Sequence, residues 1–363
     1  MKKKIEVLKL DRNMRLPAAQ SSGLCWHHPA AAPLQLAGFA WYPEDRLYRR
    51  MPEHPPKPVP EAVDILSNCT AGGQIRFTSN TRRLSLRVTL REKSNMYHMP
   101  PTGQSGFDCY IGPVGKSLYI STTRFEQLAR QYECELFSFP EKAWRIITIN
   151  FPLYQGVKKV EVGFEAEAEI KPPPRYDNES PLVFYGTSIT QGGCASRPGM
   201  LYTNIMSRRI NRPFLNFGFS GNGRGEPEVA ECLATLKNPG LFVLDYEANC
   251  MELPKLRKTM PVFIRILRSA HLKVPILVIS RTPRASEMYF PDELAQRLAR
   301  RDYQRALVNT LRVRGDRRMF FHDGTNLLGK DPSEATVDGG HPTDLGFINI
   351  ADALTPVVQK IIH

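Results

Sequence analysis

The pattern of the chain changes near residue 171, and this change constrains the fold more than any other feature of the sequence. Residues 171–181 are rich in proline and polar side chains, which favour an extended chain and offer little apolar surface to bury. A chain of 363 residues is long for one domain and sufficient for two. We therefore predict an N-terminal domain over residues 1–175 and a C-terminal domain over residues 176–363.

Downstream of this boundary, apolar runs of strand length alternate with amphipathic stretches of helix length. Such alternation is typical of a parallel sheet that is covered by helices on both faces. The C-terminal domain is therefore predicted to be α/β, with a three-layer, doubly wound parallel sheet. The expected strands are 181–186, 214–218, 241–245, 274–280 and 318–322, and the expected helices lie near 200–211, 227–237, 253–270, 292–314 and 343–362.

Upstream of the boundary, strand signals dominate. Residues 74–78 and 83–90 alternate apolar with polar side chains, which is the period of a half-buried strand. Several short strands separated by turns favour a β-sandwich of jelly-roll type. Residues 1–44 have weaker patterning, and we expect them to wrap around one of the two domains. The further expected strands are 107–111, 117–120, 133–138, 145–150 and 159–164.

Two remote motifs in the C-terminal half carry the residue types of a nucleophilic triad. Ser188 follows an apolar run, so its side chain is expected at the carboxyl end of a strand, where open α/β sheets build their sites. A serine hydroxyl needs a base to become a nucleophile, and the imidazole of His341 titrates near neutral pH. Asp338, three residues earlier, can fold back onto the other ring nitrogen. The three residues are therefore the predicted catalytic set.

Two more patches lie between these motifs, a glycine-rich turn over 217–225 and the end of an apolar run at 241–249. In type and order, the four patches resemble the blocks of the SGNH (GDSL-like) hydrolases. The resemblance implies a flavodoxin-like fold and a serine esterase in which Ser188 is the nucleophile and His341 the base. It also implies an oxyanion hole made by the backbone N–H groups of Ser188 and Gly221 and the side-chain amide of Asn249.

A second resemblance lies in the N-terminal half. Residues 106–110 read Gly-Phe-Asp-Cys-Tyr, which is similar to the Gly-x-Asp-Leu-Tyr signature of a β-rich domain that precedes SGNH hydrolases. Cys109 stands in the place of the usual leucine. The two resemblances together imply the architecture that the strand and helix signals predict.

Four residues form the predicted substrate pocket. Thr187 and Glu247 stand in the first and third blocks, where the family commonly has other residues. Tyr97 and His98 lie in the proline-containing loop 95–103, which is expected to lean over Ser188, because long loops that carry such groups often line sites.

Structural roles compete with each of these assignments. Ser188 could cap a helix, His341 could open the last helix, and Asn249 could be a turn residue. His98 could be a hydrogen-bonded side chain without a role in the site. A thiol nucleophile also has to be considered, because Cys194 and Cys250 lie near the proposed site in sequence.

Composition narrows the remaining classes of partner, cofactor and cellular location. The net charge of +13 comes largely from scattered arginines and from the arginine-dense stretch 297–318, which is typical of a solvated helix face. We therefore expect no nucleic-acid partner. Seven cysteines without paired spacing argue against a disulfide framework, and no cofactor or metal is expected. The N-terminus lacks the apolar core of a signal peptide, and we expect no apolar run to be long enough to span a bilayer, so we predict a cytoplasmic protein that acts without a membrane.

The sequence thus predicts a serine esterase that removes short acyl groups, acetyl above all, from a carbohydrate or another small ester. An acyltransferase that uses the same acyl-enzyme is the first alternative. A non-catalytic carbohydrate-binding or scaffold protein on the same fold is the second. The oligomeric state stays open.

Overall fold

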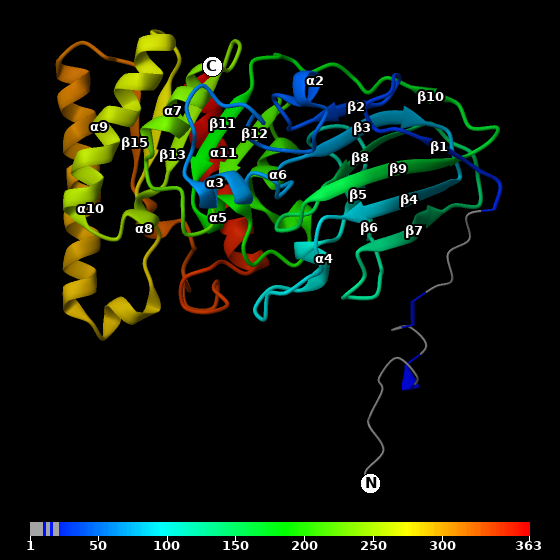
Figure 1. Ribbon diagram of the computed structural model, residues 1–363. Coiled ribbons are helices and arrows are strands. Elements are labelled where there is room, and N and C mark those ends of the chain that lie inside the picture. Colours follow the sequence, from blue (N-terminus) through cyan, green and yellow to red (C-terminus); the bar gives the residue numbers. More distant parts are fainter. Residues whose placement is uncertain (1–9, 12–14, 17–21) are drawn as a thin grey trace.

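The computed structural model describes residues 10, 11, 15, 16 and 22–363, and in these residues two antiparallel sheets stand beside a parallel sheet flanked by helices (Figure 1). The parallel sheet belongs to the C-terminal half, and its strand order is β12-β11-β13-β14-β15. This doubly wound order reverses direction between β11 and β13, and open sheets bind ligands at such a reversal. The strands are β11 (Leu182–Gly186), β12 (Phe214–Gly218), β13 (Leu241–Asp245), β14 (Ile276–Ile279) and β15 (Met319–His322), which confirms the predicted sheet.

Both faces of the parallel sheet are buried, because alternate residues of each strand pack against helices on opposite sides. Val183 and Tyr185 contribute to one core, whereas Leu182 and Phe184 contribute to the other. The first face is covered by α7 (Pro227–Ala234), α9 (Leu253–Ala270) and α10 (Pro291–Val313), and the second by α6 (Tyr202–Ser207) and α11 (Asp344–Ile362). The shorter elements are α5 (Ser188–Gln191), α8 (Glu247–Cys250), η2 (Pro198–Met200), η3 (Ala285–Met288) and η4 (Gly324–Asn326).

Helix α11 is long and apolar enough to cross a membrane by length and composition alone, which the sequence analysis did not expect. Its apolar stripe is nevertheless packed inside the protein. Phe347, Ile350, Leu354 and Val358 are buried in the core that α11 shares with α6. The apolar character of this helix is therefore accounted for by its place in the core.

The N-terminal half forms the predicted β-sandwich. One sheet has the order β1-β9-β4-β7, and the other has the order β10-β3-β8-β5-β6 with β2 also paired to β3. Alternate residues of the two sheets meet in a single apolar core. The strands are β1 (Leu24–His27), β2 (Gln35–Ala37), β3 (Gln74–Ser79), β4 (Arg83–Leu90), β5 (Asp108–Ile111), β6 (Leu118–Thr122), β7 (Gln131–Ser138), β8 (Arg145–Asn150), β9 (Val157–Glu165) and β10 (Ile170–Lys171).

The sequence analysis missed the shortest elements, which are β1, β2, β10 and the helices α2 (Tyr42–Asp45), α3 (Glu61–Leu66) and α4 (Pro101–Gln104). Most of residues 1–21 lie outside the described residues, so the expected wrapping segment can be followed only from residue 22 onward. There it supplies β1 and β2, which pair with β9 and β3 of the sandwich.

The two halves share their apolar cores. Met51 and Val63 pack into the core beneath α7 and α9, and Met99 and Leu153 pack into the core of α6 and α11. The buried guanidinium of Arg50 donates to the carbonyls of Leu66 and Cys69 and, across the junction, to that of Gly218 at the end of β12.

A buried ion pair also joins the halves. Asp108, at the start of β5, is fully buried, and its Oδ2 accepts from Arg197 Nη1 at 2.9 Å and from the Gly199 backbone N–H at 2.7 Å. Its Oδ1 accepts from Asn150 Nδ2 at 2.8 Å. Asp108 is the aspartate of the Gly-x-Asp-Leu-Tyr resemblance, and Tyr110 of the same signature meets Arg197 through its hydroxyl at 2.5 Å.

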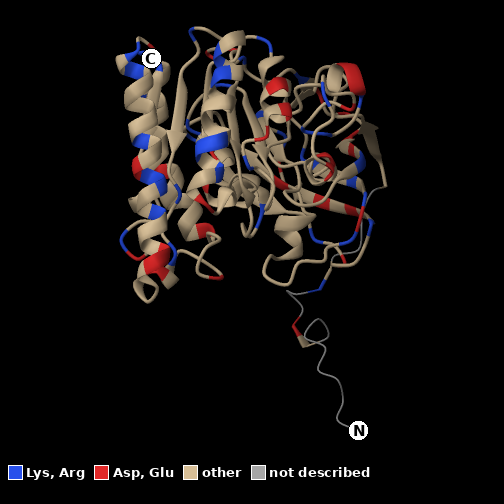
Figure 2. Cartoon of the chain, turned by 60° about the vertical axis from the view of Figure 1, so that its left-hand side comes forward, with Lys and Arg blue, Asp and Glu red and all other residues tan. Residues whose placement is uncertain are grey.

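Basic and acidic residues are both spread over the surface of the molecule (Figure 2), and on α10 the two kinds are interspersed. Arg301 and Arg305 on α10, for example, both pair with Asp302 and Asp323. The prediction of a solvated arginine face is nevertheless wrong for Arg297 and Arg300 of the same helix, which are buried.

Replacing Asp108 by alanine is expected to lower the free energy of unfolding by about 3–5 kcal/mol, because Arg197 then keeps a largely buried charge without its partner. Urea unfolding followed by tryptophan fluorescence measures the change. The matched control is Asp331→Ala, at an exposed loop position. If the two variants lose the same stability, the ion pair does not stabilise the junction.

Asp245, at the end of β13, makes stability depend on pH. Burial raises its pKa from about 3.8 to about 7, although the hydroxyls of Thr190 and Tyr202 donate to its carboxylate and oppose the shift. Because the folded-state pKa lies above the unfolded one, the cost of charging Asp245 is complete above pH 7 and disappears as the pH falls towards 4.

The Asp245→Asn variant should therefore be more stable than the wild type at pH 8, and this advantage should shrink at pH 5. Thermal unfolding at the two pH values measures it. An advantage that is equal at both pH values, or that is larger at pH 5, would contradict the raised pKa.

Candidate active site

Ser188 lies at the first position of α5, directly after β11, at the carboxyl edge of the parallel sheet. The helix is capped by Thr187, whose hydroxyl accepts from the Ile189 N–H at 3.3 Å, so Ser188 itself is not the cap. The residue is only 8 % exposed, and its hydroxyl faces His341. The strand-to-helix turn therefore presents the hydroxyl at the edge where the sheet order reverses.

His341 links the Ser188 hydroxyl to a carboxylate. Its Nε2 lies 2.8 Å from Ser188 Oγ, and its Nδ1 lies 2.7 Å from Asp338 Oδ2. Asp338 Oδ1 accepts from the backbone N–H groups of His341 and Gly340 at 2.7 and 3.0 Å, which fixes the carboxylate against the ring. The geometry favours the tautomer with a proton on Nδ1 and leaves Nε2 to accept from Ser188.

The carboxylate of Asp338 is held in its charged form. Partial burial raises its pKa, but the hydrogen bonds from the backbone and ring of His341, together with that from Gly340, outweigh burial and give a pKa below the ordinary value. A charged carboxylate at this position orients the imidazole and stabilises the imidazolium that would form during proton transfer.

The three expected oxyanion donors lie around the same hollow as Ser188. Among the described residues, the backbone N–H groups of Ser188 and Gly221 have no hydrogen-bond acceptor. Gly221 has a φ of +67°, and an added Cβ would meet nothing within 4 Å. Asn249 donates one amide hydrogen to the Phe219 carbonyl at 3.2 Å, which holds its side chain at the edge of the hollow.

This space, called here the Ser188 hollow, has a volume of about 640 Å³. Thr187, Gly221, Asn249, Asp338 and His341 line it together with Ser188. The sequence analysis missed the segment after β14, of which Arg281, Thr282, Arg284 and Ser286 also line it. This segment could have been found by the rule that located Ser188, since it follows a predicted strand.

The expectation that Glu247 lines the substrate pocket is wrong. Glu247 is 1 % exposed, and its carboxylate accepts from the Arg281 backbone N–H and the Arg300 side chain, both at 3.0 Å, and from Gln304 at 2.6 Å. It lies behind the hollow in a charged cluster that also contains Glu287 and Arg297. Its role is to hold the segment after β14 against α10.

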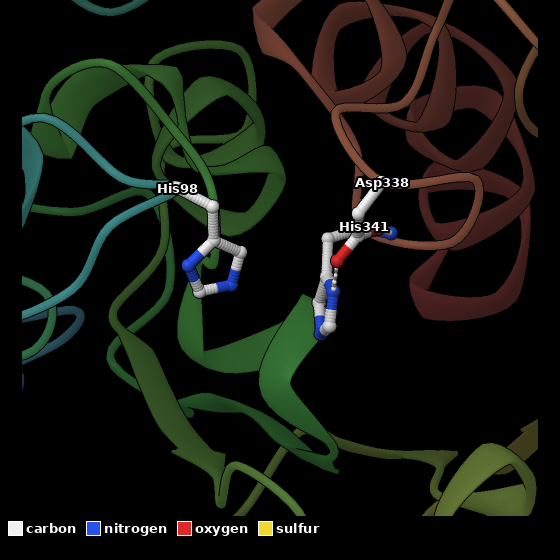
Figure 3. Close-up of side chains that lie close together, drawn as sticks. All are labelled: His98, Asp338 and His341. Atoms are coloured by element: carbon white, nitrogen blue, oxygen red, sulfur yellow. Dashed lines mark hydrogen bonds and ion pairs between the residues drawn. The ribbon is translucent and has the colours of Figure 1, made fainter.

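The loop that carries Tyr97 and His98 reaches the catalytic imidazole from the N-terminal half. The rings of His98 and His341 lie 5.8 Å apart and nearly perpendicular, and Figure 3 shows His98 facing the Asp338–His341 pair from a separate segment. Tyr97 stacks on His98 at 4.6 Å and is 95 % exposed. Both residues line a second space, the His98 hollow, of about 660 Å³, rather than the Ser188 hollow.

His98, Asp338 and His341 could also offer three ligand atoms to a metal, since one atom from each lies within 4.8 Å of the others. Asp338 and His341 are, however, already hydrogen-bonded to each other, and His341 is also hydrogen-bonded to Ser188. Their geometry is that of a proton-transfer chain.

Neither cysteine near the site is placed as a nucleophile. Cys194 and Cys250 are buried and do not line the Ser188 hollow. Burial raises the pKa of Cys194 to about 12 and that of Cys250 to about 11, so both remain thiols at neutral pH.

Family comparisons divide the chain as the fold does. Residues 179–359 match the GDSL-like lipase/acylhydrolase family, and residues 24–170 match the N-terminal domain of SGNH-hydrolase-type esterases. The comparison with curated proteins found no match.

Solved structures share both halves. A GDSL-like lipase from Bacteroides ovatus has 28 % sequence identity and a TM-score of 0.85 over 93 % of this chain and 98 % of that one. A salicylyl-acyltransferase from a tetracycline biosynthetic pathway has 16 % identity and a TM-score of 0.73 over 94 % and 98 %. An acetyl xylan esterase from the rumen bacterium Butyrivibrio proteoclasticus has 14 % identity and a TM-score of 0.56 over 93 % and 99 %.

The family matches and the similarity to the Bacteroides structure identify the chain. The protein is an ester-hydrolysing enzyme of the GDSL-like (SGNH) lipase/acylhydrolase family, with the N-terminal sandwich domain of SGNH-type esterases in front of its α/β domain.

Proposed function

We propose that the enzyme removes short acyl groups, acetyl above all, from a carbohydrate through an acyl-enzyme on Ser188. The observation that carries the proposal is the continuous hydrogen-bond chain from Ser188 through His341 to Asp338. It ends in a hollow where the N–H groups of Ser188 and Gly221 are available to an incoming carbonyl.

In the acylation step, His341 Nε2 takes the proton of Ser188 as the serine oxygen attacks the ester carbonyl. Negative charge develops on the carbonyl oxygen and is stabilised by the N–H groups of Ser188 and Gly221 and by the amide of Asn249. The intermediate collapses, the bond to the alcohol breaks, and His341 gives its proton to the leaving oxygen. Water then attacks the acyl-enzyme by the same route and releases the acid.

The choice of a carbohydrate rests on the surface beside His341. The leaving alcohol has to lie close to His341 Nε2, and the ring of His98, which lines the His98 hollow, lies 5.8 Å from the His341 ring. Tyr97 presents an almost fully exposed ring there, backed by His98. An exposed aromatic face with neighbouring polar groups suits the apolar face of a sugar ring. The similar acetyl xylan esterase acts, by its description, on an acetylated polysaccharide.

Acyl transfer is the second candidate. The same hollow could hold an acceptor alcohol in the place that water would occupy, and the residues of the chemical steps would not change. Product analysis with acetylated xylose as donor and a second sugar as acceptor separates the two activities. Free acetate as the main product supports the esterase, and an acetylated acceptor supports the transferase.

Replacing Ser188 by alanine is expected to lower kcat for p-nitrophenyl acetate by about 10⁶-fold, because the nucleophile and its base act as a unit. Ser269→Ala, on the exposed side of α9, is the matched control and should keep wild-type turnover. A Ser188→Ala variant with wild-type turnover would instead support a non-catalytic protein.

Replacing Tyr97 by alanine is expected to raise KM for an acetylated xylo-oligosaccharide by about 3- to 10-fold, the range of one aromatic contact. The value of kcat, and the turnover of p-nitrophenyl acetate, should stay unchanged, since that small ester does not need the ring. Tyr289→Ala removes another exposed tyrosine, from the segment before α10, and serves as control. Equal KM values for the wild type, Tyr97→Ala and Tyr289→Ala would show that Tyr97 does not contact the substrate.

A further inference from the structure

A third space lies at the junction of the two halves, at the edge of the parallel sheet opposite to the edge that carries Ser188. Residues 174–177 and 207–212, which precede β11 and β12, form part of its wall, whereas Ser188 follows β11. The strands are parallel, so the space lies at their amino ends. Residues of β3, β5 and β8 and the loop 112–117 complete it, and its volume of about 440 Å³ suits a small molecule. We call it the arginine hollow.

Four arginines line this hollow, and three of them have no carboxylate partner among the described residues. Arg76 binds Gln35 and the Pro174 carbonyl, and Arg208 binds the Asn204 carbonyl. The side chain of Arg212 has no hydrogen bond or ion pair to any residue in the described part of the chain, although its backbone N–H donates to the Ile210 carbonyl at 2.8 Å. The fourth, Arg209, pairs with Asp352 at 2.6 Å. Of the described residues that line the hollow, only Asp177 carries a carboxylate, and it accepts from Asn211.

Two of these arginines, Arg76 and Arg208, stack on tyrosine rings. The Cζ of Arg76 lies 3.8 Å from the centre of the Tyr176 ring, and that of Arg208 lies 4.0 Å from the centre of the Tyr110 ring. A guanidinium that stacks on a ring uses its face for the contact and keeps N–H groups at its edge for an acceptor. The rings therefore pre-orient two forked donors towards one space.

These cations are partly withdrawn from water. Burial lowers the pKa of Arg208, although Tyr110 and Asp108 oppose the shift, and burial lowers the pKa of Arg212 without any opposing partner. Arg76 is 7 % exposed. Partly desolvated charges of one sign around a common space repel each other, and a bound anion would relieve that repulsion.

We propose that the arginine hollow binds a small molecule through an anionic group, a carboxylate or a phosphate carried on a body of about the size of a sugar. Arginine forks match the oxygens of both groups. This site is separate from the Ser188 hollow and does not depend on the ester chemistry proposed above.

Isothermal titration calorimetry of the full chain at constant ionic strength tests the proposal. The probes are D-glucuronate, D-glucose 6-phosphate, inorganic phosphate and neutral D-glucose. Arg212→Gln, at a partly exposed position, should weaken binding of the anionic probes by about 10-fold or more, the usual effect of losing one charge-assisted hydrogen bond. Arg208→Gln should do the same. Arg265→Gln, on the exposed face of α9, is the matched control and should bind like the wild type.

Binding of glucuronate alone identifies a carboxylate ligand, and binding of the phosphates alone identifies a phosphoryl ligand; either result supports the site. Three results overturn it: no anion binds, glucose binds as well as the charged sugars, or Arg212→Gln and Arg208→Gln bind like Arg265→Gln. A circular dichroism spectrum of each variant shows that lost binding does not come from unfolding.

Discussion

The buried pair of Asp108 and Arg197 is the interaction on which the arrangement of the site depends. It fixes the segment that begins at Ser196, and the backbone N–H of Ser196 donates to Asp344 at 2.8 Å, at the start of α11. Just before α11, the Pro342 carbonyl accepts from the backbone N–H of Cys194 at 3.3 Å. His341 is the neighbour of Pro342. A carboxylate of the sandwich thus sets, through two short segments, the position of the imidazole relative to Ser188.

The sequence predicted those parts of the fold that a short stretch of residues determines by its own pattern. The apolar runs of β11 and β13 are buried on both faces, so they stand out, and the residues that follow such runs gather at one edge of the sheet. Ser188 was predicted in this way, whereas Asp338 and His341 were predicted from their chemistry and spacing, and the oxyanion roles of Gly221 and Asn249 came from the family resemblance. Glu247 was misplaced because its direction is set by Arg281 and Arg300, which come from later elements. Strands β1 and β2 were missed because pairing with β9 and β3, rather than their own pattern, makes them strands.

The same reasoning explains the surplus of positive charge. Sequence spacing placed the arginines of α10 on a solvated face, yet Arg297 and Arg300 turn inward to Glu287 and Glu247 and brace the segment that lines the Ser188 hollow. Arg76 comes from one stretch and Arg208 and Arg212 from another that is distant in sequence, and they meet only in the folded chain. Net charge alone could not distinguish arginines that pair with a carboxylate from arginines that lie together around one hollow without such a partner.

The sharing of side chains across the junction limits how such an enzyme can change over evolutionary time. Met51 and Val63 complete a helical core that lies in the other half of the molecule, and Arg50 binds the end of β12. Exchange of the sandwich with that of a distant relative would leave holes beneath α7 and α9 and would leave carbonyl groups without donors. Recombination between lineages should therefore transfer the two halves together, and new specificities should arise in loops such as the one that carries Tyr97.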